Sequence, residues 1–182
     1  MSDFSKPKVQ FPPLFISTYT QPFCGMEARA IGGINPASGA WPLALYVAYV
    51  PFQLPFPYLV RRIWWQNGSA AGGNTDVGVY TSGGTRVFST GSTAGSGNSA
   101  PQFVTIADTL LHPGSYFFAM VHDSITTNQL QRGTTLSIVQ QRAIGHLSQT
   151  LGSGPLPVTA TFAASSQIVY PLCGISCLAS GF

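Results

Sequence analysis

The chain has very little charge. Only 13 of its 182 residues are Asp, Glu, Lys or Arg, which is 7% of the sequence, whereas an ordinary soluble protein carries about 25%. Hydrophobic residues make up 45%, the reverse of the composition that keeps a chain disordered. The net charge of +3 is not gathered into the basic cluster of a nucleic-acid-binding protein. We therefore expect a folded protein with no nucleic-acid partner, whose uncharged surface is covered by a membrane, a sugar-coated partner or other protein subunits.

Long hydrophobic runs suited to a membrane are also missing. Two stretches, 30–60 and 143–182, contain no Asp, Glu, Lys or Arg. Prolines interrupt both stretches, so neither can form a spanning helix of about 20 residues. The N-terminus, Met-Ser-Asp-Phe-Ser-Lys-Pro-Lys, lacks the apolar core of a signal peptide. We expect no membrane insertion and a protein made in a cytoplasm, which it leaves only by lysis or inside a larger particle.

Cysteine is scarce as well. The three cysteines are Cys24, Cys173 and Cys177, and an odd number without a signal peptide argues against a disulfide framework. The spacing Cys173-Gly-Ile-Ser-Cys177 resembles half of a metal site, but no Cys or His pair at a suitable spacing supplies the other half. We expect reduced, partly buried thiols and no metal.

The few acids and histidines form no catalytic pattern. A glycosidase requires two carboxylates that flank the scissile bond, but Asp76, Asp108 and Asp123 lie at predicted strand ends or turns. An Asp there commonly accepts hydrogen bonds from nearby backbone amides. A calcium site built from Asp76, Asp108 or Asp123 with backbone carbonyls is an alternative, although the chain has no dense acidic loop. His122 precedes Asp123, which puts the two side chains on opposite faces of a strand. We expect no enzyme and no cofactor.

Short strands and turns dominate what the chain does contain. The 20 Gly and 14 Pro residues punctuate runs that are rich in β-branched and aromatic residues, without a convincing helical period. We predict strands over 43–50, 58–66, 75–81, 85–89, 101–107 and 115–122, and weaker strands over 134–139, 158–162 and 167–172. About eight strands at this spacing predict an all-β fold, an antiparallel β-sandwich that is jelly-roll-like.

The first 40 residues differ from the rest. Residues 1–40 are rich in Pro and Gly but carry many large apolar side chains, which a free flexible tail would rarely do. We predict an extended N-terminal arm over 1–40, lying in a groove of its own or a neighbouring subunit, followed by a β-sandwich domain with a C-terminal strand or tail over 41–182. One or two irregular strands of the same domain are the alternative. The candidate arm contacts are Phe11, Phe15, Tyr19 and Phe23.

The strand predicted over 115–122 is apolar on both faces. Its run Ser-Tyr-Phe-Phe-Ala-Met-Val-His alternates so that Tyr116, Phe118 and Met120 share one face while Phe117, Ala119 and Val121 share the other. Only one set can face the sandwich core, whereas an antiparallel sheet normally shows water its second face. The second set must therefore meet another layer, an arm or another subunit. We expect the ends of the chain, including the segment from Ala143, to contact neighbouring subunits.

Several motifs in the predicted strands carry a resemblance. They are Arg62-Ile-Trp-Trp-Gln-Asn-Gly68, Asp76-Val-Gly-Val-Tyr80, Gly83-Gly-Thr-Arg-Val87, Ser89-Thr-Gly-Ser92 and Asp108-Thr-Leu-Leu-His-Pro-Gly-Ser-Tyr-Phe-Phe-Ala-Met120. Over roughly residues 41–123 the chain resembles β-sandwich domains in tailed-bacteriophage virion proteins. Such domains serve in head decoration proteins, head fibres and tail-associated proteins, usually as trimers or larger symmetric assemblies. The resemblance implies no catalytic residues, and similar sandwiches also occur as carbohydrate-binding modules.

Two functions follow as expectations. The first is a non-enzymatic structural protein of a bacteriophage virion, synthesised in the host cytoplasm, which forms a homo-oligomer (a trimer above all) and contacts other virion proteins. Within this class a head decoration or fibre component is favoured. The alternative is a carbohydrate- or receptor-binding module that binds a host-surface glycan through exposed aromatic rings. The aromatic residues that could serve as subunit contacts or as stacking platforms are Trp41, Tyr58, Trp64, Trp65 and Tyr80.

Overall fold

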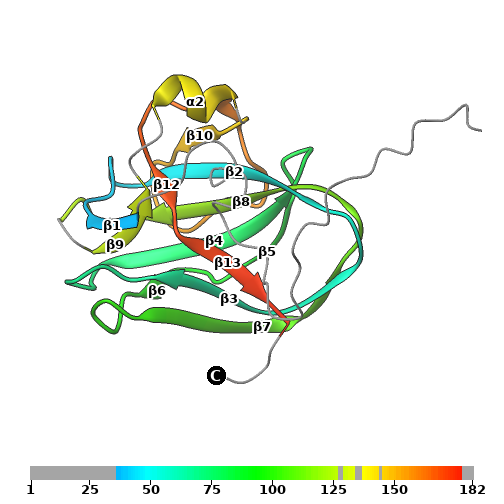
Figure 1. Cartoon of the computed structure of the whole chain (residues 1–182), viewed down its shortest axis with the longest axis horizontal. Helices are drawn as coiled ribbons and strands as arrows, with labels where there is room; N and C mark the ends of the chain where they lie inside the picture. The colour runs from blue at the N-terminus through cyan, green and yellow to red at the C-terminus, as the bar shows by residue number, and fades with distance from the viewer. Residues whose placement is uncertain (1–35, 127–128, 134–136, 144, 178–182) are drawn as a thin grey trace, which may run out of the picture.

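The computed structural model describes residues 36–126, 129–133, 137–143 and 145–177 (Figure 1). These residues form three antiparallel sheets, which confirms the prediction of an all-β fold consistent with a sandwich. The larger sheet has the order β11-β10-β2-β8-β4-β5, with β6 also paired to β4. Its strands are β2 (Tyr46–Leu54), β4 (Asn74–Thr81), β5 (Arg86–Ser89), β6 (Thr93–Ala94), β8 (Gly114–His122), β10 (Leu147–Thr150) and β11 (Ala163–Ala164).

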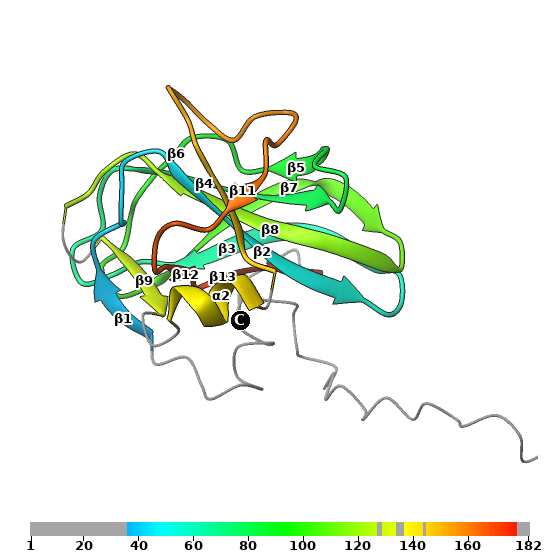
Figure 2. The same cartoon turned by 90° about the horizontal axis from the view of Figure 1, so that it is seen from above.

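Two smaller sheets complete the fold. One has the order β13-β3-β7 and packs against the larger sheet (Figures 1 and 2). Its strands are β3 (Tyr58–Gln66), β7 (Pro101–Leu111) and β13 (Cys173–Ser176). The other has the order β1-β9-β12, with β1 (Pro36–Gly39), β9 (Leu130–Gly133) and β12 (Tyr170–Pro171). The strands predicted over 58–66, 75–81 and 115–122 match β3, β4 and β8 to within one residue, whereas the strand predicted over 43–50 overlaps β2 only over 46–50.

The main core lies between the larger sheet and the sheet β13-β3-β7. The strand period of two sends Phe118 and Met120 of β8 inward, where they join Ile63 and Trp65 of β3 and Ile175 of β13 in one buried cluster. Each of these five side chains is at most 1% exposed. Burial of this apolar area, at about 25 cal/mol per Å², holds the two layers together.

The second apolar face of the larger sheet is covered by the chain itself. Ala119 and Val121 of β8 form a separate buried cluster with Leu156, which lies in the connection between β10 and β11. We call residues 151–162 the strap (orange in Figure 2). Ala160 and Phe162 of the strap pack against the same cluster. Another layer of this chain therefore satisfies the prediction that the second face must be covered.

The C-terminal segment from Ala143 contributes strands to its own subunit, and the expectation that it also contacts neighbouring subunits stays a prediction. In the described residues 145–177, β10 and β11 extend the larger sheet, while β12 and β13 join the two smaller sheets. This segment is thus part of its own subunit's fold. The strand predicted over 158–162 is wrong, because this part of the strap forms only an isolated bridge between Thr159 and Thr85.

A short helix, α2 (Ile138–Ala143), replaces the described part of the strand predicted over 134–139. Ser137 and Gln140 form a reciprocal capping box: the Ser137 amide donates to Gln140 Oε1 (2.8 Å), and the Gln140 amide donates to Ser137 Oγ (3.3 Å). The helix ends at Ala143, and Gly145 beyond it has φ +81. The amides of Gly145 and His146 donate to the carbonyls of Arg142 and Gln141, the bonding pattern of a Schellman motif.

The boundary of the predicted arm falls inside the fold. Residues 36–39 form β1, which pairs with β9, so the folded domain includes the last part of the segment predicted as an arm. The candidate arm contacts Phe11, Phe15, Tyr19 and Phe23 lie outside the described residues. Among the helices described, none is long and apolar enough to cross a membrane.

Candidate functional site

Three of the five aromatic residues singled out from the sequence belong to the interior of this subunit. Trp41, Trp65 and Tyr80 are at most 1% exposed. The Trp41 indole donates to the Tyr46 carbonyl (2.7 Å), the Trp65 indole to Asn67 Oδ1 (3.0 Å), and the Tyr80 hydroxyl to the Pro157 carbonyl (2.5 Å). Their rings therefore offer no face to a sugar or a second subunit, which corrects the role predicted for these three.

The other two aromatic residues, Tyr58 and Trp64, are half-buried on β3. Trp64 is opposite Phe103 of β7 in the register, and the guanidinium of Arg62 lies 4.6 Å from the centre of the Phe103 ring. Tyr58 packs against the main core, and burial, aided by the nearby Cys177, raises the pKa of its hydroxyl. Trp64 and its neighbours are thus the part of the predicted aromatic set that an external ligand could approach.

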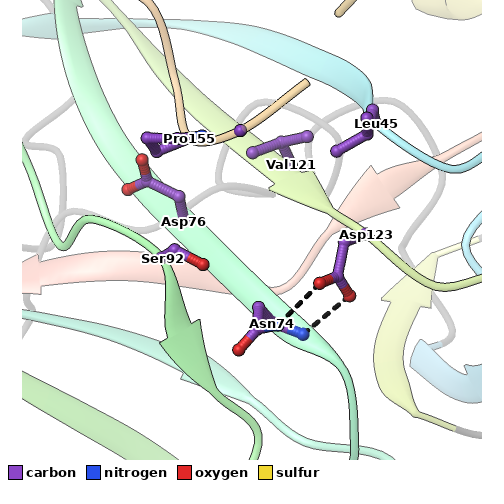
Figure 3. A pocket seen from close by; sticks show the side chains of 8 residues that line it. Leu45, Asn74, Asp76, Ser92, Val121, Asp123 and Pro155 are labelled. Atoms are coloured by element: carbon purple, nitrogen blue, oxygen red, sulfur yellow. Dashed lines mark hydrogen bonds between the residues drawn. The ribbon is translucent and has the colours of Figure 1, made fainter. Parts of the chain in front are cut away.

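Two of the three candidate acids line one small pocket (Figure 3). The pocket has a volume of about 90 Å³ and lies between β4, the end of β8 and the strap. Asp123 accepts two hydrogen bonds from the backbone and side-chain nitrogens of Asn74, both 2.7 Å long. Although slight burial acts in the opposite direction, these bonds hold the pKa of Asp123 below its usual value.

Asp76, the other acid in this pocket, secures the strap. It is 2% exposed and accepts hydrogen bonds from the Leu156 amide (2.9 Å) and from Thr90 Oγ1 (3.1 Å). Burial raises the pKa of Asp76 above its usual value, although these hydrogen bonds and the positive charge of Arg86 partly offset the shift. The Arg86 guanidinium donates to the Leu156 carbonyl. The carboxylate therefore fastens the strap to β4.

The structure does not assemble the calcium site considered from the sequence. Asp108 is outside the pocket of Asp76 and Asp123 and forms an exposed ion pair with Arg61 (3.2 Å). In the described part of the chain, no group of three or more His, Cys, Asp or Glu side chains could hold a metal ion. Cys173 is buried in β13 and Cys177 is exposed, while Cys24 lies outside the described residues.

The two buried histidines hold polar contacts inside the fold. The ring of His122 is 0% exposed and lies between Thr75 Oγ1 (3.0 Å from Nδ1) and Gln129 Oε1 (2.9 Å from Nε2). Asp123 is exposed beyond the end of β8, so the strand alternation predicted for the pair does not extend to it, and the side chains of His122 and Asp123 both approach Gly73. His146 Nδ1 lies 2.8 Å from Gln141 Oε1. With 0% and 1% exposure, neither imidazole is positioned to meet a substrate.

A larger groove lies at an open side of the sandwich. Edge strand β5 of the larger sheet and edge strand β7 of the sheet β13-β3-β7 form its walls, and Val158 of the strap adds to the lining. Its volume is about 560 Å³. The side chains of Phe88, Val104 and Ile106 pack on the main core from this side. We call this feature the β5–β7 groove.

The sequence did not reveal this groove. Residues 85–89 and 101–107 were both predicted as strands, but which of them form sheet edges depends on the order of pairing. β7 has eleven residues, whereas the strand predicted there over 101–107 has seven.

A scan against protein-family models and searches of curated proteins and of solved structures found no match for the chain. The site is therefore interpreted from its own geometry.

Proposed function

We propose that this chain is a non-enzymatic structural protein of a bacteriophage virion that assembles through uncharged contacts between subunits. The observation that carries this proposal is the combination of a surface of 9497 Å² with only 13 charged residues in the chain. A protein that remains alone in solution normally places charges over a quarter or more of its surface residues.

Burial inside the subunit accounts for only part of this composition. The apolar faces of β2 and β8 are covered by the chain's own layers. Large hydrophobic side chains nevertheless remain exposed across the described surface, by 37–70%: Leu43, Phe56, Val87, Leu110, Ile125, Val139, Val158 and Ile168. Contacts with other subunits would remove such side chains from water, at about 25 cal/mol per Å² of apolar area. This supports assembly as the role of the fold.

The resemblance of residues 41–123 to phage virion sandwiches supports the choice of particle, and a head decoration or fibre component is the favoured place within it. Mass spectrometry of purified particles from a culture that produces the protein tests this directly. We expect the chain at a fixed copy number per particle. Recovery of the chain only in the particle-free fraction would refute the proposal.

The carbohydrate-binding alternative now depends on Trp64 with Arg62 and Phe103 on the outer side of β3 and β7. A glycan array compares the wild type with Trp64→Ala. Glycan binding that disappears in this variant while assembly persists would favour the alternative. Equal glycan-binding signals from the wild type and from Trp64→Ala would exclude the carbohydrate-binding alternative at this site.

A further inference from the structure

The β5–β7 groove has the form of a site for an added strand. β7 has eleven residues, and within the described structure only β3 pairs with it. Ten of its eleven residues are exposed or half-buried, and two of the exposed ones, Thr105 and Ala107, line the groove. A long edge strand with unpaired backbone groups is a template for another chain segment, and peptides commonly bind sheets by this addition.

The lining of the groove favours an uncharged occupant. Arg86 is its only charged residue, and the guanidinium already donates to the Leu156 carbonyl. Val87 and Val158 line the groove and are 37% and 65% exposed, while Phe88, Val104 and Ile106 form its floor over the core. An apolar segment would bury these side chains, whereas a positively charged one would lose its hydration and find no acidic residue in the lining.

The chain itself contains a segment with these properties. Thirty-five residues precede Pro36, and from Val9 to Met26 they carry no Asp, Glu, Lys or Arg. Within that run, Leu14–Gln21 (Leu-Phe-Ile-Ser-Thr-Tyr-Thr-Gln) is free of proline and is bounded by Pro13 and Pro22. Its β-branched and aromatic residues favour a strand, and its eight residues fit within the eleven of β7.

We propose that Leu14–Gln21 of one subunit adds as a strand alongside β7 of a neighbouring copy. In a strand, Phe15 and Tyr19 lie on the same face, which places both in the β5–β7 groove against Phe88 and Ile106. This inference rests on the proposed function, since it identifies the contact through which the copies assemble.

The position of β1 favours a neighbouring subunit over the same one. β1, which continues from the N-terminal segment, lies on the opposite side of the molecule from β5 (Figure 2). The 14 residues between Gln21 and Pro36 span at most about 48 Å, enough to cross to an adjacent subunit when a small domain is about 30 Å wide. Binding in its own groove would require the segment to wrap around the subunit and order most of those residues, at about 1–2 kcal/mol each.

Such a contact joins two different surfaces, the segment of one copy and the groove of the next. Contacts of this kind close into a ring when the rotation between copies allows it. The expected trimer is one such ring.

A charge placed in the groove tests the contact. Val87→Asp changes an exposed groove residue, so the fold should tolerate it, while the bound segment would bury the new carboxylate. We expect association of the full-length protein to weaken by about tenfold or more. Val139→Asp is the matched control, because Val139 is 70% exposed on α2 and does not line the groove. Equal weakening in both variants, or in neither, would overturn the proposal.

A cross-link identifies the occupant. The variant Ala107→Cys is made in a Cys24→Ser/Cys177→Ser background, and a benzophenone maleimide is attached to the new cysteine so that the probe lies in the groove. This unlabelled (light) protein is then mixed with ¹⁵N-labelled (heavy) protein that lacks the new cysteine. We expect the probe to capture the tryptic peptide 9–29 of the heavy partner. Capture of the light peptide in an unassembled subunit would show that the segment binds the groove of its own subunit. That result would overturn the proposed contact between neighbouring copies. Ala164→Cys, an exposed alanine on β11, is the control.

These outcomes separate the two proposals. If the protein assembles but the probe captures another peptide or none, the groove assignment is wrong while the assembly function stands. If the full-length protein does not assemble at all, both fail.

Discussion

Single buried side chains set the response of this fold to pH. His146 is 1% exposed, and burial lowers its pKa from 6.5 to about 4, because the imidazolium cannot be hydrated there. Gln141 Oε1 accepts from Nδ1, which suits the neutral ring. The unfolded chain gains the proton near pH 6.5 and the folded chain only near pH 4. The contribution of His146 to stability is therefore complete above pH 6.5 and is lost as the pH falls towards 4.

The expected loss is roughly 3 kcal/mol over that interval. Urea unfolding of the wild type and of His146→Gln between pH 4 and pH 8 measures it, because Gln does not titrate. We expect the wild-type free energy of unfolding to fall more steeply below pH 6.5 than that of the variant. Parallel curves would mean that His146 does not carry this proton linkage.

Gly73 shows how backbone conformation and close packing act together at one residue. Its φ is +65, and a Cβ there would lie 2.8 Å from both Asp123 Oδ1 and His122 Cε1. Gly73→Ala should destabilise the fold by about 1–3 kcal/mol. Two controls separate the effect of the positive φ from the effect of the close contacts. Gly91 has φ +67 but open space around it, and Gly152 has open space and no positive φ in this range. Thermal unfolding should rank the losses as Gly73→Ala, then Gly91→Ala, then Gly152→Ala, and any other order contradicts this account.

At the scale of elements, the strap allows a sheet with two apolar faces to fold within one subunit. Leu156 is 2% exposed against Ala119 and Val121, so Leu156→Ala should cost about 2–5 kcal/mol. Val158, two residues further along the strap, is 65% exposed, and Val158→Ala should change stability by less than about 0.5 kcal/mol. Denaturant unfolding compares them. Similar small changes in both variants would show that the strap is not part of the cooperative fold.

The strands were the elements that the sequence could predict, because apolar alternation in β3, β4 and β8 reflects their local environment. Alternation does not indicate which segment covers a second apolar face, so the strap was assigned to neighbouring subunits or to a strand. Helix α2 has only six residues, too few for a helical period. Its signals were the capping pair Ser137 and Gln140 and the terminal Gly145.

The candidate site could be predicted less well than the fold. Strand alternation places the adjacent Trp64 and Trp65 on opposite faces of β3, in keeping with the half-buried Trp64 and the buried Trp65. Alternation gives no indication of burial for Trp41, which lies outside any strand. The β5–β7 groove depends on which strands end up at sheet edges. That order is decided by long-range pairing, which no local pattern encodes.

For the whole molecule, scarcity of charge predicts an assembly that tolerates salt. At about 1 M salt the Debye length is about 3 Å, so contacts between exposed charges are largely screened, whereas apolar contacts persist. The only ion pair within the described residues, Arg61–Asp108, is 40% and 60% exposed and contributes little. The subunit contacts should therefore resist an increase in salt.

The mass of the native assembly tests the central claim most directly. Sedimentation compares the full-length chain with a chain lacking residues 1–35, which leaves β1 intact, at about 0.1 M and 1 M NaCl. We expect the full-length protein to form the same oligomer at both salt concentrations, and the shortened chain to be a folded monomer. A full-length monomer, dissociation at 1 M NaCl, or normal assembly of the shortened chain would contradict the account.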